Sequence, residues 1–190
     1  MRTALLNLSR AVLKWPPESS HPSVKQDMVA RLGRDCTSLV ETGTYRGDMI
    51  DAQLDNFERI ATIELDDDLF ATARDKFSPH PHVTVLHGDS GEVLPEAIEL
   101  CHGSTAFWLD GHYSGGVTAG TNADVPILKE LATIAARKDP GDVILIDDAR
   151  LFGWRRGYPR ISKVRAIAND IWPGHEFRVE ADIICIVPRS

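Results

Sequence analysis

Five short apolar segments of this chain each end in acidic residues. The ends read ETGTYRG (41–47), ELDDD (64–68), HGDS (87–90), LDGHYSGG (109–116) and IDDAR (146–150). Carboxylates accept hydrogen bonds from hydroxyl groups and attract cations, and a single one would be explained as the cap of a following helix. Five in succession, each after an apolar run, predict a binding site instead.

The first of these segments places two glycines, Gly43 and Gly47, between an apolar run and a helix-like stretch. Glycine allows a positive φ and close approach to the backbone, and a helix start offers free N–H groups. A nucleotide-like ligand suits such a turn, although the glycines can also be purely structural. The spacing differs from GxGxxG, no lysine follows in P-loop fashion, and Glu41 would repel a pyrophosphate. The turn therefore favours a hydroxyl-bearing or cationic ligand.

Glu64 follows Gly43 at the spacing of about 20 residues at which an acid accepts both hydroxyls of a ribose. Helix capping is the alternative, and for that role Asp66 is the better candidate. Asp89 and Ser90 follow the third apolar run and are placed for an adenine amino group and the backbone beside it. Ser90 could equally cap a helix.

Asp147 and Asp148 directly follow the apolar run VILI, where buried charges would be costly without a partner. Together with Asp110, on a neighbouring run, they form a plausible site for magnesium, which prefers carboxylate oxygens. In the alternative, one acid caps a helix, another pairs with Arg150 or Arg155, and no metal binds.

His112 lies two residues past Asp110 and is the best candidate for a general base, because imidazole titrates near physiological pH. The alternative is a histidine that only hydrogen-bonds within its loop. Two polar segments, 114–124 and 151–160, are long enough to close over a ligand or to shape an acceptor pocket. The second carries Trp154, Arg155, Arg156 and Tyr158, which would equally suit an oligomer interface.

The elements that must position these residues alternate along the chain. Apolar runs typical of strands lie at 37–42, 59–65, 82–88, 105–110, 142–148, 175–181 and 182–188, and helix-like stretches lie between them at 47–57, 67–77, 90–100, 123–138 and 160–172. This alternation predicts an α/β fold with a mostly parallel sheet covered on both faces, since parallel neighbours need crossover connections. The last two runs are nearly contiguous and predict a hairpin. Phe107 and Trp108 are expected in the core.

The composition indicates a single domain over 1–190, with a helical appendage over 1–35 and the core over 36–190. The formal net charge of −7 argues against a nucleic-acid partner, and no apolar run reaches the roughly 18 residues of a membrane span. The three cysteines, Cys36, Cys101 and Cys185, lack the spacing of a zinc site or disulfide framework, as in a cytoplasmic protein.

In combination and order, the motifs resemble those of the class I S-adenosylmethionine-dependent methyltransferases. E41-T-G-T-Y-R-G47 resembles the first motif of metal-dependent O-methyltransferases such as the catechol and caffeoyl-CoA enzymes. LDGHY and IDDA resemble the acidic motifs of the macrocin and novobiocin sugar O-methyltransferases. The resemblance covers roughly residues 37 to 188. One departure is plain: the catechol-type enzymes use a lysine in the loop after Asp110, and no lysine occurs there before Lys129.

The resemblance implies a Rossmann-like, doubly wound sheet of seven strands, mostly parallel with an antiparallel last strand. It places the methionine part of S-adenosylmethionine against the first motif (Glu41, Thr42, Gly43, Thr44, Tyr45 and Gly47), the ribose at Glu64 with Leu65, and the adenine at Asp89 and Ser90. Asp110 would contribute to both cofactor binding and catalysis. It also implies a divalent cation, usually magnesium, held by Asp110, Asp147 and Asp148.

We therefore expect an S-adenosylmethionine-dependent methyltransferase that methylates a hydroxyl of a small molecule, with His112 as the base and a divalent metal assisting. A metal-independent methyltransferase, a non-catalytic S-adenosylmethionine-binding module and hydroxylase-like chemistry with a redox metal are the alternatives. The short chain leaves the pocket to its loops and N-terminal helices, with a second subunit of a homo-oligomer as a further contributor.

Overall fold

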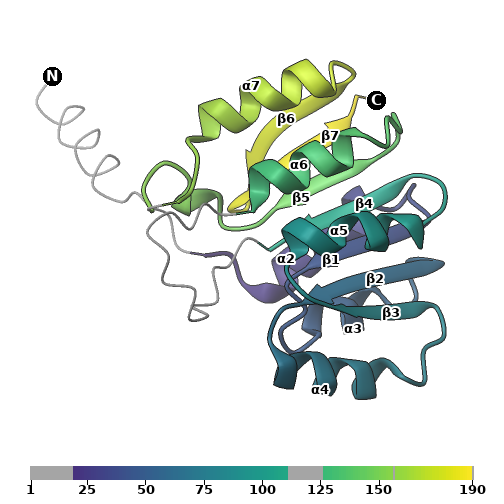
Figure 1. Ribbon diagram of the computed structural model, residues 1–190. Coiled ribbons are helices and arrows are strands. Elements are labelled where there is room, and N and C mark those ends of the chain that lie inside the picture. The colour runs from purple at the N-terminus through teal and green to yellow at the C-terminus, as the bar shows by residue number, and fades with distance from the viewer. Residues whose placement is uncertain (1–18, 111–125, 156, 190) are drawn as a thin grey trace, which may run out of the picture.

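The chain folds around a single seven-stranded sheet. The computed structural model describes residues 19–110, 126–155 and 157–189 (Figure 1). The strands are β1 (Ser38–Thr42), β2 (Arg59–Glu64), β3 (Val83–His87), β4 (Thr105–Leu109), β5 (Val143–Ile146), β6 (His175–Glu180) and β7 (Ile183–Pro188). Their order is β3-β2-β1-β4-β5-β7-β6, with β1 to β5 parallel and β7 antiparallel to both of its neighbours. The predicted α/β class and antiparallel last strand are confirmed.

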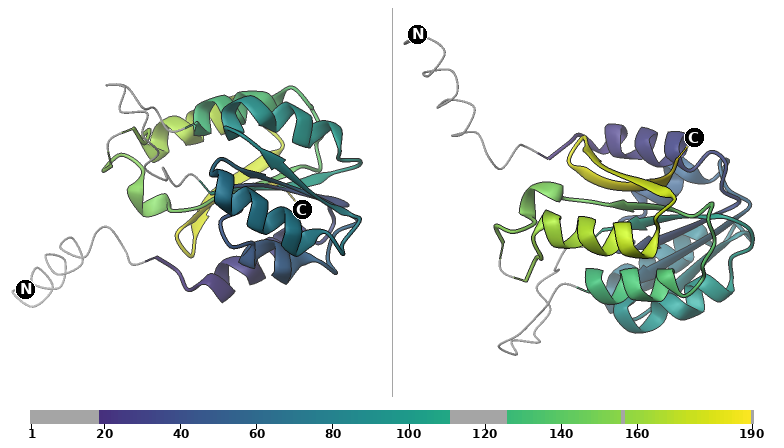
Figure 2. Two further views of the ribbon diagram at one scale, coloured as in Figure 1. Left: turned by 60° about the horizontal axis from the view of Figure 1, so that its bottom comes forward. Right: turned by 90° about the horizontal axis from the view of Figure 1, so that it is seen from above.

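Helices cover both faces of this sheet (Figure 2). The helices are α2 (Pro22–Leu32), α3 (Asp48–Gln53), α4 (Asp67–Phe77), α5 (Ser90–Glu99), α6 (Ile127–Ala135) and α7 (Ile161–Ile171), with a short 3-10 turn η1 (Ala149–Leu151) after β5. Side chains of α5, α6 and α7 belong to one buried cluster, and those of α2, α3 and α4 belong to the other. The sheet is therefore doubly wound, and both of its faces are buried.

Alternation along β4 shows how each strand serves both layers. Phe107 and Leu109 belong to the cluster under α5, α6 and α7, whereas Ala106 and Trp108 belong to the opposite cluster. Because successive side chains of a strand point to opposite faces, a strand buried on both sides must be apolar throughout. The expectation that Phe107 and Trp108 lie in the core is confirmed.

Helix α2 belongs to one of these layers. Its Met28 and Val29 are buried in the same cluster as α3 and α4. Pro22 lies in the first turn of α2, where the backbone N–H that proline lacks would have no partner within the helix. The side chain of His21 accepts a hydrogen bond from the backbone N–H of Ser23. The first 18 residues of the helical appendage expected over 1–35 lie outside the described residues.

The last two strands form the expected hairpin, and its two-residue turn consists of Ala181 and Asp182. Both residues have a positive φ, at 49° and 62°, as a type I′ turn requires. Because β7 runs antiparallel to β5, this turn lies at the carboxyl end of β5. There the Ala149 N–H donates to the Asp182 carbonyl at 2.8 Å. Asp182 thereby joins the sheet edge at which the parallel strands end.

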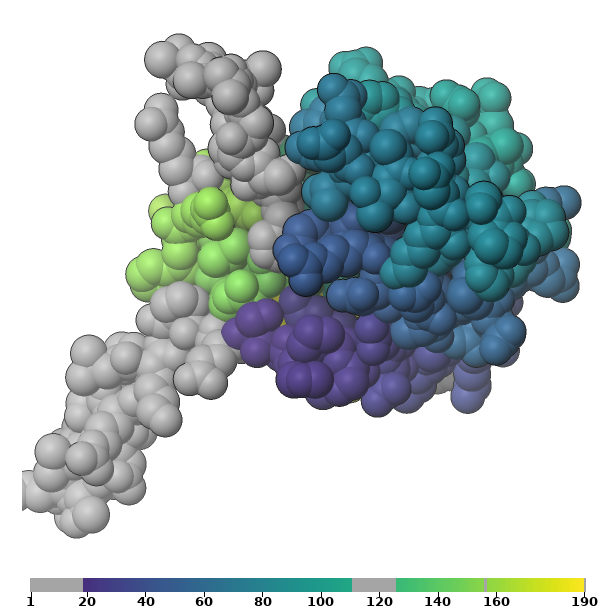
Figure 3. Space-filling view, turned by 90° about the horizontal axis from the view of Figure 1, so that it is seen from below, coloured from purple at the N-terminus to yellow at the C-terminus, as the bar shows by residue number. Residues whose placement is uncertain are grey.

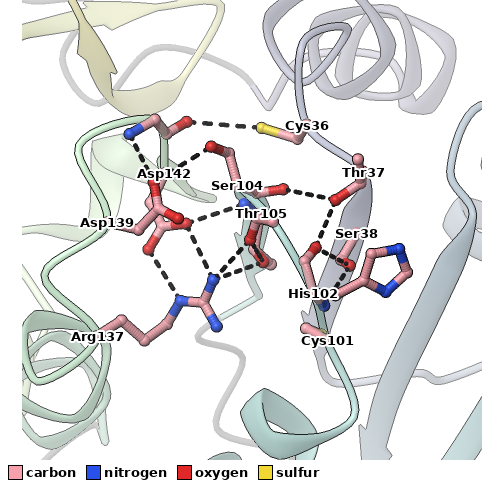
Figure 4. A network of polar contacts seen from close by, with 12 residues as sticks. Cys36, Thr37, Ser38, Cys101, His102, Ser104, Thr105, Arg137, Asp139 and Asp142 are labelled. Carbon is pink, nitrogen blue, oxygen red and sulfur yellow. Dashed lines mark hydrogen bonds and ion pairs between the residues drawn. The ribbon is translucent and has the colours of Figure 1, made fainter.

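The opposite edge of the sheet, where the parallel strands begin, is closed by a polar network (Figure 4). Asp142 is buried and accepts from the Thr105 N–H at 2.9 Å and from the Arg137 Nε at 3.0 Å. Arg137 also donates to the Gly103 carbonyl at 2.9 Å. Since these polar atoms bind one another, this edge serves the fold.

None of the helices in the described part of the chain is long and apolar enough to cross a membrane.

The amino-edge network makes the first prediction, for Arg137→Met. Methionine keeps much of the aliphatic stem but removes the cation, leaving the buried Asp142 carboxylate without its counter-charge. We expect urea unfolding to show a loss of about 3 kcal/mol, the scale seen when one partner of a buried ion pair is removed. Arg34→Met is the matched control, because Arg34 pairs with Asp35 on the surface, and such pairs contribute about 1 kcal/mol or less. Equal losses in both variants would contradict the account.

Candidate functional site

The acids predicted to share a site do meet at the carboxyl edge of the sheet. Backbone pairing continues past the strand ends, because the Asp110 N–H donates to the Thr42 carbonyl at 3.2 Å and the Asp147 N–H donates to the Leu109 carbonyl at 3.0 Å. Asp110 therefore lies between the turn after β1 and the residues after β5. The residues after β2 and β3 flank the same turn on its other side.

The two glycines of the first turn have different structural reasons. Gly43 has a φ of 89°, and a Cβ there would lie 3.3 Å from the Asp110 carbonyl oxygen, so glycine allows β1 and β4 to end close together. Gly47 has a φ of 72°, and a Cβ there would lie 2.6 Å from the Phe77 ring. The packing of α4 against this position is thus sufficient to explain Gly47, in agreement with the alternative that this glycine is purely structural.

Glu41 is buried in β1, with 2% of its surface exposed. Its Oε2 accepts from the Thr62 hydroxyl at 2.6 Å, and that hydroxyl also contacts the Thr44 hydroxyl at 2.6 Å. Burial raises the pKa of Glu41 to about 8, against the opposing hydrogen bond from Thr62. The chain Glu41–Thr62–Thr44 ties the floor of the glycine turn to β2.

Glu64 joins the glycine turn to the end of β2. Its Oε2 accepts the Tyr45 N–H at 2.7 Å, and its Oε1 accepts the Asp66 N–H at 3.0 Å. Each carboxylate oxygen has a second lone pair, so the group can still accept hydroxyl protons from a ligand. Tyr45 and Leu65, on either side of it, are exposed. Asp66 caps α4 through the N–H groups of Asp68 and Leu69, as expected.

Of Asp89 and Ser90, the sequence analysis named Ser90 as the candidate helix cap, but the structure gives the capping role to Asp89. Asp89 is the N-cap of α5 and accepts the Gly91 N–H at 2.7 Å. Ser90 instead donates its hydroxyl to Glu130 Oε1 at 2.7 Å. The residue that caps α5 is therefore Asp89 and not Ser90.

Glu130, on α6, contacts the candidate site through Ser90 and was not singled out from the sequence. Only 1% of its surface is exposed, and burial raises its pKa to about 7, against the opposing hydrogen bond from Ser90. Among the described residues, its Oε2 has no hydrogen-bond partner. The signal lay in its position, because Glu130 stands among Ile127, Leu131 and Ile134 on the apolar face of its helix.

Three carboxylates gather after β5. Asp147, Asp148 and Asp182 each offer an oxygen within 4.8 Å of the others. Burial raises the pKa of Asp147 to about 6, against the opposing hydrogen bond from Lys25. Asp110 lies outside this group of three. Asp182, which the sequence analysis did not single out, takes its place through the β6–β7 turn.

Two cations of the chain already contact these acids. Lys25 Nζ, from α2, lies 2.5 Å from Asp147 Oδ2 and 3.7 Å from Asp148 Oδ1. The Arg150 guanidinium binds both Asp148 and Asp182, so the pairing of an acid with Arg150, the alternative to a metal site, is present. Figure 3 shows α2 (purple) on the same face as the segment after β5 (green).

This arrangement does not fit the expected magnesium site. Asp147 Oδ1 accepts the Asp148 N–H at 2.6 Å, and its Oδ2 is bound by Lys25. An ammonium between Asp147 and Asp148 occupies the place at which a metal ion would bridge them. Lys25 carried no signal in the sequence, because its position was set by the packing of α2.

A cavity of about 610 Å³ opens beside the Asp89 cap. Lys129 of α6, Lys163 of α7 and Tyr158 form other parts of its wall. Burial raises the pKa of Tyr158 to about 12, with Asp148 adding to the shift. Of the segment 151–160, Tyr158 therefore lines a cavity, whereas Trp154 is 69% exposed. His112, the segment 114–124 and Arg156 lie outside the described residues.

Three of the solved structures to which this chain is similar are methyltransferases, and two of them have different acceptors. S-adenosylmethionine-bound CalS10, an amino pentose methyltransferase from Micromonospora echinaspora, is 16% identical with a TM-score of 0.57, over 96% of this chain and 97% of that one. S-adenosylhomocysteine-bound PaMTH1 from Podospora anserina is 16% identical with a TM-score of 0.57, over 87% and 78%. The 23S rRNA methyltransferase ErmE is 17% identical with a TM-score of 0.56, over 91% and 70%.

No protein-family model matches the sequence, and no curated protein matches it. At these identities the solved structures establish the fold alone: a Rossmann-like methyltransferase fold with a seven-stranded sheet.

Glu130 generates a prediction about pH. Its pKa is about 7 in the folded chain and 4.5 as the reference value, so the unfolded chain loses the proton first as pH rises. The contribution of Glu130 to the free energy of unfolding should therefore fall between pH 5 and 8, and Glu130→Gln should remove this pH-dependent contribution. Relative to the wild type, the variant should gain about 2 kcal/mol between these pH values, measured by urea unfolding.

Glu99→Gln, at an exposed position of α5, is the control and should show no such change. A difference between Glu130→Gln and the wild type that stays constant from pH 5 to pH 8 would rule out the buried, protonated Glu130.

Proposed function

We propose that this chain binds S-adenosylmethionine at the carboxyl edge of the sheet and transfers its methyl group to a small molecule. The observation that carries the proposal is Glu64, whose carboxylate is fixed by the N–H groups of Tyr45 and Asp66. An acid at this strand end, about 20 residues past a glycine turn, suits the two hydroxyls of a ribose. The S-adenosylmethionine- and S-adenosylhomocysteine-bound structures of the same fold support the choice of ligand.

The proposed seat of the ligand follows the edge of the sheet. The turn after β1 would hold the methionine part, with Gly43 allowing close approach and Thr42, Thr44 and Gly47 shaping the turn. Glu41 would support this turn from beneath, because its carboxyl group is buried in β1. Tyr45 and Leu65, both exposed beside Glu64, would flank the nucleoside.

The adenine would lie toward Asp89 and Ser90, at the mouth of the cavity beside α5. Asp110 would border the reacting end of the ligand, because it contacts the turn at Gly43.

When bound, S-adenosylmethionine supplies an electrophilic methyl group on its sulfonium. The chain has to hold an acceptor in line with that methyl group and exclude water, which contributes more than covalent catalysis. For a hydroxyl acceptor, His112 is the proposed base that takes the proton as the new bond to carbon forms. O-methylation is thus the leading form of the proposal.

A small acceptor is favoured over RNA by charge. The carboxylates of this edge and the formal net charge of −7 would repel a phosphate backbone, although ErmE shows that the fold can serve RNA. The cavity lined by Asp89, Lys129 and Tyr158 is of a size suited to a small molecule.

Two further forms of the proposal differ in the role of a metal and in turnover. Magnesium at Asp110, Asp147 and Asp148 is the expectation from sequence, but the contacts of Lys25 and Arg150 favour the metal-independent form. No step of the proposed reaction passes through an ion. A non-catalytic S-adenosylmethionine-binding module would bind the ligand and transfer nothing.

The ligand is tested by calorimetric titration with S-adenosylhomocysteine. We expect saturable binding to the wild type and a loss of at least about tenfold for Glu64→Gln, because an amide cannot accept through both of its terminal atoms. Glu96→Gln, exposed on α5, is the control and should bind as the wild type does. A wild-type chain that does not bind S-adenosylhomocysteine would refute the proposal.

The base is tested with His112→Ala. With a hydroxyl acceptor found by screening, we expect kcat to fall by about 100-fold, the scale of general base catalysis, with the Kd for S-adenosylhomocysteine unchanged. His102→Ala, which removes an exposed histidine that contacts Glu58 on the surface, serves as the control. An unchanged kcat would remove His112 from the reaction.

A further inference from the structure

Lys25 holds a particular place among the acids after β5. Its ammonium lies 2.5 Å from Asp147 Oδ2 and 3.7 Å from Asp148 Oδ1, so it bridges the two carboxylates that follow β5. Only 13% of its side chain is exposed. A lysine on the surface of a protein ordinarily keeps its ammonium in water, whereas this one is largely withdrawn from it.

The helix that carries Lys25 is fastened at several points. Met28 and Val29 are buried against the sheet. The Gln53 side chain donates to the Gln26 carbonyl at 3.0 Å, and the Gln26 side chain donates to the Asp48 carbonyl at 3.0 Å. Just before α2, the Ser20 hydroxyl donates to the Ala181 carbonyl at 2.7 Å. These contacts fix the base of the Lys25 side chain relative to both α3 and the β6–β7 turn.

Arg150 completes the neutralisation. Its backbone N–H donates to Asp182 Oδ1 at 2.7 Å, and its guanidinium binds Asp182 Oδ2 and Asp148 Oδ1. The three carboxylates and two cations carry one formal negative charge together. Asp182 thus holds Arg150 against the β6–β7 turn, and the Arg150 guanidinium links Asp148 to Asp182.

We propose that Lys25 is the resident cation of this acidic cluster and stands in place of a divalent metal. Magnesium binds carboxylates at about 2.0–2.1 Å in near-octahedral geometry and gives up its waters reluctantly. An ion bridging Asp147 and Asp148 would stand next to the ammonium of Lys25 and would be repelled by it. The ion could enter only if the Lys25 ammonium gave up its contacts with Asp147 and Asp148, and the packing of α2 keeps the base of that side chain beside the cluster. The chain therefore excludes divalent metals, and removing this one ammonium opens the cluster to them.

The test is manganese binding, followed by electron paramagnetic resonance on the whole chain. We expect no saturable Mn²⁺ binding by the wild type. Lys25→Met keeps the unbranched stem of the side chain without its charge and should bind Mn²⁺ at least about tenfold more tightly. Adding Asp147→Asn to Lys25→Met should abolish the gain. Lys76→Met, which removes a lysine paired with Asp51 on the surface, is the matched control and should resemble the wild type.

Two results would overturn the proposal: Mn²⁺ binding by the wild type that is lost in Asp147→Asn, or no gain of binding in folded Lys25→Met. Circular dichroism is used to check that Lys25→Met is folded. If it is not folded, Lys25→Gln is used in its place. The inference concerns cation binding and does not depend on methyl transfer. Titration of the same samples with S-adenosylhomocysteine distinguishes failure of this proposal from failure of the proposed function, because Mn²⁺ binding and cofactor binding are measured separately.

Discussion

Burial of the parallel strands β1, β2, β4 and β5 on both faces is the constraint on which the rest of this structure depends. It requires these strands to be mostly apolar, and parallel pairing, which also includes the edge strand β3, brings five carboxyl ends to one edge. Acids placed at that edge are therefore partly withdrawn from water. Burial accordingly raises the pKa of Glu41 to about 8, of Glu130 to about 7 and of Asp147 to about 6.

The cost of these acids is offset by elements far away in the chain. Helix α2 supplies Lys25 to Asp147, and the β6–β7 turn supplies Asp182, which fixes Arg150 against Asp148. The antiparallel hairpin thus does more than complete the sheet, because it returns the chain to the edge where the parallel strands end. A site without these contacts would hold closely spaced like charges with little water between them.

The strand ends could be predicted from sequence because period and turn chemistry are local, and the class and antiparallel end of the sheet are confirmed. Of the partners of the acids, Arg150 was expected in the alternative without a metal, whereas Lys25 and Asp182 could not be predicted. Lys25 reaches Asp147 only through the packing of α2, and Asp182 arrives through the register of a hairpin. Glu130 carried a weak signal, as an acid on an apolar helix face. Boundaries shifted where prolines act: the helix expected from residue 123 begins at Ile127, after Pro126.

The central claim is that the carboxyl edge of the sheet seats S-adenosylmethionine. A crystal structure of the chain with S-adenosylhomocysteine tests it most directly. The account predicts the ribose hydroxyls on Glu64, the amino-acid part against the turn at Gly43 and the adenine beside Asp89. The ligand bound elsewhere, or bound at this edge with Glu64 still contacting only the N–H groups of Tyr45 and Asp66, would contradict it.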